Sequence, residues 1–157
     1  MKNIFILLLS LILSTSLMAA GSDSSSGSSS SSSSSSNEES LYEDAVKLVK
    51  RAGKLEKKDK TDKAKKLYAQ AFDKLEKAHK TDKKNPDILN YMGFTTRKTG
   101  NFEKAEKFYL KGLSIKPNHN GINEYLGELY VQTNRIDKAN ERLEAVSYTH
   151  LTLPTIA

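Results

Sequence analysis

Side chains that commonly carry catalysis or bind metals are sparse in this sequence. The chain has no cysteine, which excludes thiolate nucleophiles and thiolate metal ligands, and its three histidines are His79, His119 and His150. The distances between them along the chain do not match the short spacings of zinc-binding motifs. We therefore expect no metal site. His79 lies near the end of a predicted helix, where a cationic side chain is favoured by the helix dipole.

Other catalytic and ligand-binding patterns are also missing. The segment Asp59–Lys63, "DKTDK", is faintly similar to a calcium loop but has neither the glycine nor the final glutamate of one. The glycines are isolated, which excludes a phosphate-binding loop, and most serines lie where no fixed base could activate them. Aromatic residues recur at helical spacing, which favours core packing over stacking on nucleic-acid bases: Phe102, Phe108, Tyr109, Tyr125 and Tyr130. We predict a protein that is not an enzyme and uses no cofactor.

The charge of the chain is concentrated in one segment. The formal net charge is +6, and residues 38–84 hold 15 basic and 10 acidic residues. A basic balance can favour nucleic acid, anionic lipid or acidic partners. Because lysines alternate with acids here, the pattern indicates a solvated helical surface. We expect no nucleic-acid partner, and weak contact with an anionic envelope surface is an alternative.

The N-terminal residues predict export. Lys2 precedes an apolar run from Ile4 to Leu13, and Ala19-Ala20 supplies the small residues of a cleavage site, so residues 1–20 resemble a secretory signal peptide. Residues 21–38 are rich in serine and predict a disordered linker. We expect an exported, periplasmic protein. A membrane anchor that keeps the signal is the alternative, although the apolar run is shorter than the ~20 residues of a typical span.

A 34-residue repeat organises the rest of the chain. Residues 85–118 align with the residues from His119 onward when shifted by 34 positions. Identical pairs at this shift include Ile88 and Ile122, Tyr91 and Tyr125, Gly93 and Gly127, Lys104 and Lys138, and Ala105 and Ala139. A fixed period of this length is typical of stacked supersecondary units.

Each repeat predicts two antiparallel helices. Asn85-Pro86 is a helix start, because asparagine caps and proline fits the first turn. Gly100 ends that helix and Asn101 can cap a second one, which Pro117 terminates. The sequence therefore predicts an all-α solenoid of about three helix pairs.

The repeated positions resemble those of tetratricopeptide repeat (TPR) proteins, particularly ones exported by bacteria. The positions that carry the resemblance, and that we expect to pack between helices, are Leu89, Met92, Gly93, Phe102, Ala105, Tyr109, Gly112, Pro117, Leu126, Gly127, Tyr130, Ile136, Ala139 and Leu143. Thr96 stands at an aromatic position of the family, Asn123 at a bulky one and Gly112 at an alanine. Glycine lets two helices approach closely, so the glycines indicate packing and no active site.

The first unit is less regular and admits two registers. One keeps the 34-residue period but places Lys58-Asp59 at the leucine-glycine position. The other, which we prefer, makes one long second helix from about Asp62 to Lys80. The predicted divisions are a signal peptide at 1–20, a linker at 21–38, a helical domain at 39–146 with units 39–84, 85–118 and 119–146, and a tail at 147–157.

The tail breaks the repeat. Residues 146–155, "VSYTHLTLPT", coincide with a translation of a transposon-based sequencing adapter. We therefore expect residues 147–157 to be non-native or disordered. Amplification of the locus from source DNA tests this, since a genomic codon run for the tail would contradict it.

The resemblance implies a role in protein interaction. In TPR proteins the first helices of successive repeats line a groove that receives a peptide or a partner protein. The residues of this sequence at the corresponding positions are Asn90, Phe94, Arg97, Lys98, Glu124, Glu128 and Gln132. Phe94 is either an anchor for the partner or part of the packing under the first unit.

The acids at two of these positions bear on the kind of partner. Some relatives clamp a C-terminal carboxylate with basic residues, and Glu124 and Glu128 argue against that specialisation. We expect no binding of chaperone tails. The sequence thus predicts a non-catalytic scaffold with a protein or peptide partner. The alternatives are a basic protein that associates with anionic lipid or polysaccharide, or a membrane-anchored assembly subunit.

Overall fold

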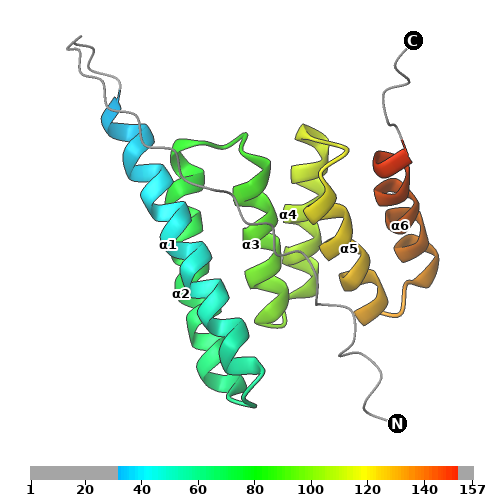
Figure 1. Cartoon of the computed structure of the whole chain (residues 1–157), viewed down its shortest axis with the longest axis horizontal. Coiled ribbons are helices and arrows are strands. Elements are labelled where there is room, and N and C mark those ends of the chain that lie inside the picture. The colour runs from blue at the N-terminus through cyan, green and yellow to red at the C-terminus, as the bar shows by residue number, and fades with distance from the viewer. Residues whose placement is uncertain (1–31, 152–157) are drawn as a thin grey trace, which may run out of the picture.

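Six helices make up the part of the chain that the structure, a computed structural model, describes, residues 32–151. Figure 1 shows them standing side by side in chain order. Their bounds are α1 Ser32–Glu56, α2 Thr61–Thr81, α3 Pro86–Lys98, α4 Phe102–Ile115, α5 Asn120–Gln132 and α6 Ile136–Leu151. Each odd-numbered helix packs on the helix that follows it, and α2 and α4 join one pair to the next. The predicted all-α repeat solenoid is confirmed.

The helix starts follow from short capping signals. The Asn85 side chain accepts hydrogen bonds from the backbone N–H groups of Asp87 and Ile88 at the start of α3, where Pro86 occupies the first turn. The Asn101 side chain accepts from the N–H of Lys104 and caps α4. Gly100 between these helices has φ +97°, a left-handed conformation that favours glycine. Both predicted caps are confirmed.

The first pair of helices has the longer second helix that the preferred register predicted. α2 runs from Thr61 to Thr81 and buries one apolar stripe. That stripe consists of Ala64, Tyr68, Ala71, Leu75 and Ala78. α1 begins at Ser32, whereas the sequence predicted helix only from residue 39. The predicted signal peptide and most of the predicted linker lie outside the described residues.

Two of the three repeat glycines lie where a side chain would collide. A Cβ on Gly93 would lie 2.5 Å from the ring atom Cε1 of the buried Tyr109, so α3 and α4 meet at the bare backbone. A Cβ on Gly112 would overlap the Cδ1 atom of Ile122 on α5. Close packing offsets the helix penalty of about 1 kcal/mol that each glycine carries. Gly127 differs, because its nearest neighbour would be the Cβ of Arg142 at 3.5 Å, an ordinary contact.

Four positions predicted to pack between helices are exposed instead, and one of them is Pro117, which lies between α4 and α5. Phe102 and Ile136 are the first residues of α4 and α6 and are 37% and 49% exposed. Leu143 on α6 is 65% exposed, because no described helix lies beyond the last pair. Helix α6 also continues to Leu151, past residue 146 where the sequence predicted the helical domain to end. Residues 152–157 lie outside the described part.

Among the described helices, none combines the length and hydrophobicity that crossing a bilayer requires.

Candidate functional site

The residues predicted to line a groove come together along α3 and α5, which lie next to each other. Within α3, Asn90 and Arg97 are buried while Phe94 and Lys98 are half-buried. The α5 members are exposed: Glu124, Glu128 and Gln132. We call this surface, together with Asp87, Tyr91 and Tyr125, the α3–α5 face.

Arg97 holds the C-terminal ends of the two helices together. Its Nη2 donates to Oε2 of Glu128 at 2.5 Å and its Nη1 to Oε1 of Gln132 at 3.1 Å. The guanidinium also lies 5.5 Å from the ring centroid of Phe94, a geometry that favours cation–π attraction. A buried arginine is stable only when its charge is paired. The guanidinium is therefore already engaged by a carboxylate of the same chain.

Lys98 is paired in the same way. Its Nζ lies 2.8 Å from Oε2 of Glu56 on α1, an oxygen that also accepts a hydrogen bond from the hydroxyl of Tyr68 at 3.0 Å. Both predicted groove cations are thus neutralised by acids from other helices.

Four aromatic side chains cross from α1 to α5 and form what we call the aromatic row: Tyr42, Tyr91, Phe94 and Tyr125. The ring centroids of Tyr42 and Tyr91 are 5.7 Å apart, edge to face, and those of Phe94 and Tyr125 are 4.9 Å apart. All four are half-buried. Phe94 also meets Tyr68 of α2 at 5.8 Å, so it packs under the first unit and borders the face at once.

Sequence reasoning found Phe94 but assigned Tyr125 to the core and gave Tyr42 and Tyr91 no role at the surface. Tyr91 and Tyr125 occupy the same repeat position, one residue before the buried position held by Met92 and Leu126. That recurrence of an aromatic residue just outside the core stripe was the available signal.

Burial and nearby carboxylates keep the phenols of the aromatic row protonated. Burial raises the pKa of Tyr42 to about 12, helped by Tyr91 and Asp87. Burial likewise raises the pKa of Tyr125 to about 12, with Glu124 adding to the shift. The pKa of Tyr91 is raised by the same two causes, burial first and then Asp87. These hydroxyl groups stay protonated well above neutral pH and can donate hydrogen bonds.

Carboxyl and amide groups lie where the N-terminal halves of α3 and α5 meet, a boundary that we call the seam. Oδ1 of Asp87 lies 3.0 Å from Nε2 of His119, the residue that caps α5. Asn90 is 6% exposed and its Oδ1 has no hydrogen-bond partner in the described part of the chain. Glu124 is exposed as a whole residue, but the packed helices partly desolvate its carboxyl and raise its pKa, and the neighbouring charge of Glu128 adds to that shift.

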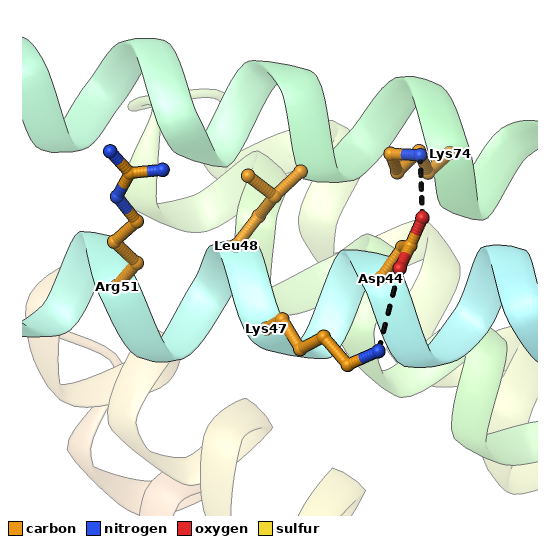
Figure 2. Close-up of a pocket in the computed structure, with 5 residues that line it drawn as sticks. All are labelled: Asp44, Lys47, Leu48, Arg51 and Lys74. Carbon is orange, nitrogen blue, oxygen red and sulfur yellow. Dashed lines mark hydrogen bonds and ion pairs between the residues drawn. The ribbon is translucent and has the colours of Figure 1, made fainter.

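Two hollows of the described surface lie on the first helix pair. One lies between α1 and α2 and is drawn in Figure 2, where Asp44 sits between the ammonium groups of Lys47 and Lys74. Its remaining lining residues are Leu48 and Arg51. A second hollow is lined by α1 alone, with Tyr42 at one side. In neither does the described structure bring together a nucleophile with a base.

A metal site would need several ligating side chains close together among the described residues. No set of three or more histidine, cysteine, aspartate or glutamate side chains there has an arrangement that could hold an ion.

The family model of the tetratricopeptide repeat matches residues 89–119. Among curated protein sequences, none matches the chain. By structure, the chain is similar to the type III secretion translocator chaperone SycD of Yersinia enterocolitica. The TM-score is 0.52 at 16% identity over 76% of this chain and 79% of SycD.

Two peptide complexes are more distant structural matches. SycD with a peptide of the translocator YopD has a TM-score of 0.47 at 15% identity, over 69% of this chain and 77% of that one. The first TPR domain of Spaghetti (RPAP3) bound to the HSP90 peptide SRMEEVD has a TM-score of 0.46 at 17% identity, over 70% and 82%.

Proposed function

Because this chain is a tetratricopeptide repeat protein, we propose that it is a non-catalytic scaffold that binds a peptide or protein partner on its α3–α5 face. The aromatic row is the observation that carries the proposal. Rings from three helices, α1, α3 and α5, lie next to one another at the surface and are only half-buried. Clustered aromatic side chains of this kind supply much of the binding energy in protein interfaces.

The ion pairs of the face support the same proposal. Arg97 and Lys98 are fixed by Glu128 and Glu56, which holds α1, α3 and α5 in register before a partner arrives. A preformed surface loses less conformational entropy on binding. Fixed helices therefore favour recognition of an extended or helical segment without refolding of the scaffold.

Selection from a random peptide library displayed on phage tests the proposal directly. The immobilised full chain should enrich peptides, and Tyr91→Ala should weaken their binding. A matched control is Phe72→Ala, since Phe72 is also a half-buried aromatic residue but pairs with Phe108 of α4 at 5.9 Å, away from the face. The proposal fails if no peptide is enriched, or if the two variants bind the selected peptides equally.

We further propose that the protein acts outside the cytoplasm. The support is the sequence pattern of residues 1–20. N-terminal sequencing of the mature protein from a bacterial host separates the possibilities: a start after residue 20 supports export with cleavage, and a start at Met1 supports the anchored alternative.

A second candidate function is contact with an anionic lipid or polysaccharide surface. The hollow of Figure 2 favours it, because Lys47, Arg51 and Lys74 surround a single carboxylate, Asp44. Arg51 has no ion pair in the described residues. Sedimentation with vesicles of anionic lipid tests this role. Binding should vanish as salt is raised, since screening acts first on exposed charges; no binding at low salt would exclude it.

A further inference from the structure

We propose that Asp87, Asn90, Tyr91 and Glu124 form a site for a lysine or arginine side chain of the partner peptide, and we call these four residues the acceptor site. The inference rests on the proposed function, because it names the chemistry that the α3–α5 face would recognise. Contacts between α3 and the start of α5 bring Asp87 and Asn90 to the seam between the two helices. Asp87 meets His119, the Asn90 amide lies beside Gly121, and Phe94 meets Tyr125.

Helical spacing places Tyr91 and Glu124 along the same boundary between α3 and α5. Tyr91 is one helical turn beyond Asp87 on α3, and Glu124 is one turn beyond Gly121 on α5. Side chains three or four positions apart share a helix face. Tyr91 therefore shares a face of α3 with Asp87, and Glu124 shares a face of α5 with Gly121, so both border the seam that the Asn90 amide enters.

Asn90 provides the strongest indication of a missing donor. It is 6% exposed, yet its carbonyl oxygen Oδ1 has no hydrogen-bond partner in the described residues. Leaving a buried acceptor unpaired is costly, and native structures seldom do so without a reason. Its amide nitrogen lies 2.9 Å from where a Cβ of Gly121 would stand, which shows that the side chain points across to α5. The oxygen is itself buried, so an ammonium or guanidinium N–H would satisfy it once the amide turns its oxygen toward the seam.

Asp87 supplies a negative charge that its hydrogen bond with His119 does not neutralise. Nδ1 of His119 accepts a hydrogen bond from the backbone N–H of Ile122 at 3.2 Å. The proton of a neutral imidazole then lies on Nε2, which donates to Oδ1 of Asp87. The pair keeps the full charge of the carboxylate, and the Asp87 side chain is 59% exposed.

Glu124 is the second carboxylate without a cation. Glu128, one turn away, is occupied by Arg97, and among the described residues Glu124 forms no ion pair. Burial and the charge of Glu128 raise the pKa of the Glu124 carboxyl, so an incoming cation would relieve that unfavourable environment.

The ring of Tyr91 completes the site. Tyr42 packs against it edge to face, and no lysine or arginine of the described chain lies over it, in contrast to Phe94 and Tyr125, which Arg97 already covers. Tyrosine faces attract cations within about 6 Å. The basic residues beside Tyr42, Lys47 and Lys50, line a separate hollow together with Glu43.

A partner carboxylate would meet the opposite arrangement. It would face two carboxylates and an acceptor oxygen, and it could reach Arg97 only by displacing Glu128. Like charges across an interface cost several kcal/mol. The charge of the site therefore selects for a cation.

The composition of the peptides selected from the displayed library tests the site. Lysine or arginine should recur at one fixed position relative to an apolar residue. A synthetic copy of the best peptide, capped at both ends, should lose affinity about tenfold when that residue is replaced by the uncharged isostere norleucine.

Variants of the chain locate the effect. Asn90→Ala and Glu124→Gln should each lower the affinity for the selected basic peptide several-fold. Both variants should bind the norleucine peptide with the same affinity as the wild type does. Glu103→Gln is the control, because it removes the same charge from an exposed position on α4. Melting curves verify that each variant is folded.

The outcomes separate this inference from the proposed function. Enriched peptides without a basic residue, or equal affinity of the lysine and norleucine peptides, would overturn the acceptor site and leave the scaffold role intact. No enriched peptide would overturn both.

Discussion

Gly93 and Gly53 lie inside helices, α3 and α1, but have different surroundings. A Cβ on Gly93 would enter the ring of Tyr109, whereas a Cβ on Gly53 would meet only the hydroxyl of Tyr68 at 4.0 Å. We expect Gly93→Ala to lower the free energy of unfolding by about 1–3 kcal/mol, because a packed core resists added volume.

Gly53→Ala is the matched control for that substitution. We expect it to raise the free energy of unfolding by up to about 1 kcal/mol, since alanine is the better helix former and the site has room. Urea denaturation of both variants measures the difference. Equal effects would show that the close approach of α3 to α4 is not what Gly93 provides.

His79 makes stability depend on pH. Its Nε2 lies 3.0 Å from Nζ of Lys111, so the neutral ring accepts from the ammonium group. Burial lowers the pKa of His79 below its ordinary value of 6.5, and the charge of Lys111 lowers it further. As the pH falls through the pKa that His79 has in the unfolded chain, the unfolded chain binds a proton that the folded chain does not. Stability from this residue is thus present above about pH 6.5 and lost below it.

His79→Gln should remove that dependence, because glutamine can still accept from Lys111 but does not titrate. We expect the drop in melting temperature between about pH 7.5 and 5.5 to be smaller in the variant than in the wild type. Thermal melts at the two pH values measure it. An unchanged drop would assign the pH sensitivity to other groups.

At the scale of helices, α4 and α6 carry equivalent positions with different neighbours. Tyr109 on α4 is fully buried because α5 covers it, while Leu143, 34 positions later on α6, is 65% exposed. We expect Tyr109→Ala to cost about 3–5 kcal/mol of unfolding free energy. Leu143→Ala should change it by less than about 0.5 kcal/mol. Chemical denaturation compares them, and a large loss at Leu143 would mean that another segment covers α6.

Helix boundaries were the most predictable level of this structure. Asn85, Asn101 and Gly100 act through bonds to their own neighbours in the chain, so local sequence predicts them. The long α2 was predictable from its apolar stripe. The early start of α1 in a serine-rich segment was not, since serine favours caps and turns over helix interiors.

The pairings across α3 and α5 were much less predictable. The 34-residue period placed Arg97, Glu128 and Phe94 on one face, but it carries no information on which side chains meet. The ion pair of Arg97 and the unpaired amide of Asn90 depend on the tilt and spacing of two helices. The histidine cap of α5 was missed because histidine is not a common capping residue, although His119 stands where the previous repeat has the capping Asn85.

For the whole molecule, charge distinguishes two regions of the described surface. Basic residues surround the hollow on the first helix pair, and uncompensated carboxylates lie in the seam of α3 and α5. The basic region would attract an anionic partner, and the acidic region would attract a cationic one. A cationic peptide should therefore avoid the first and bind the second.

Amide hydrogen exchange of the full chain, with and without a library-selected peptide, tests the central claim most directly. Bound peptide orders the helices it contacts and slows their local opening. We predict slower exchange in α3 and α5, with little change in α4 and α6. Protection confined to the even-numbered helices, or spread evenly over all six described helices, would contradict binding on the α3–α5 face.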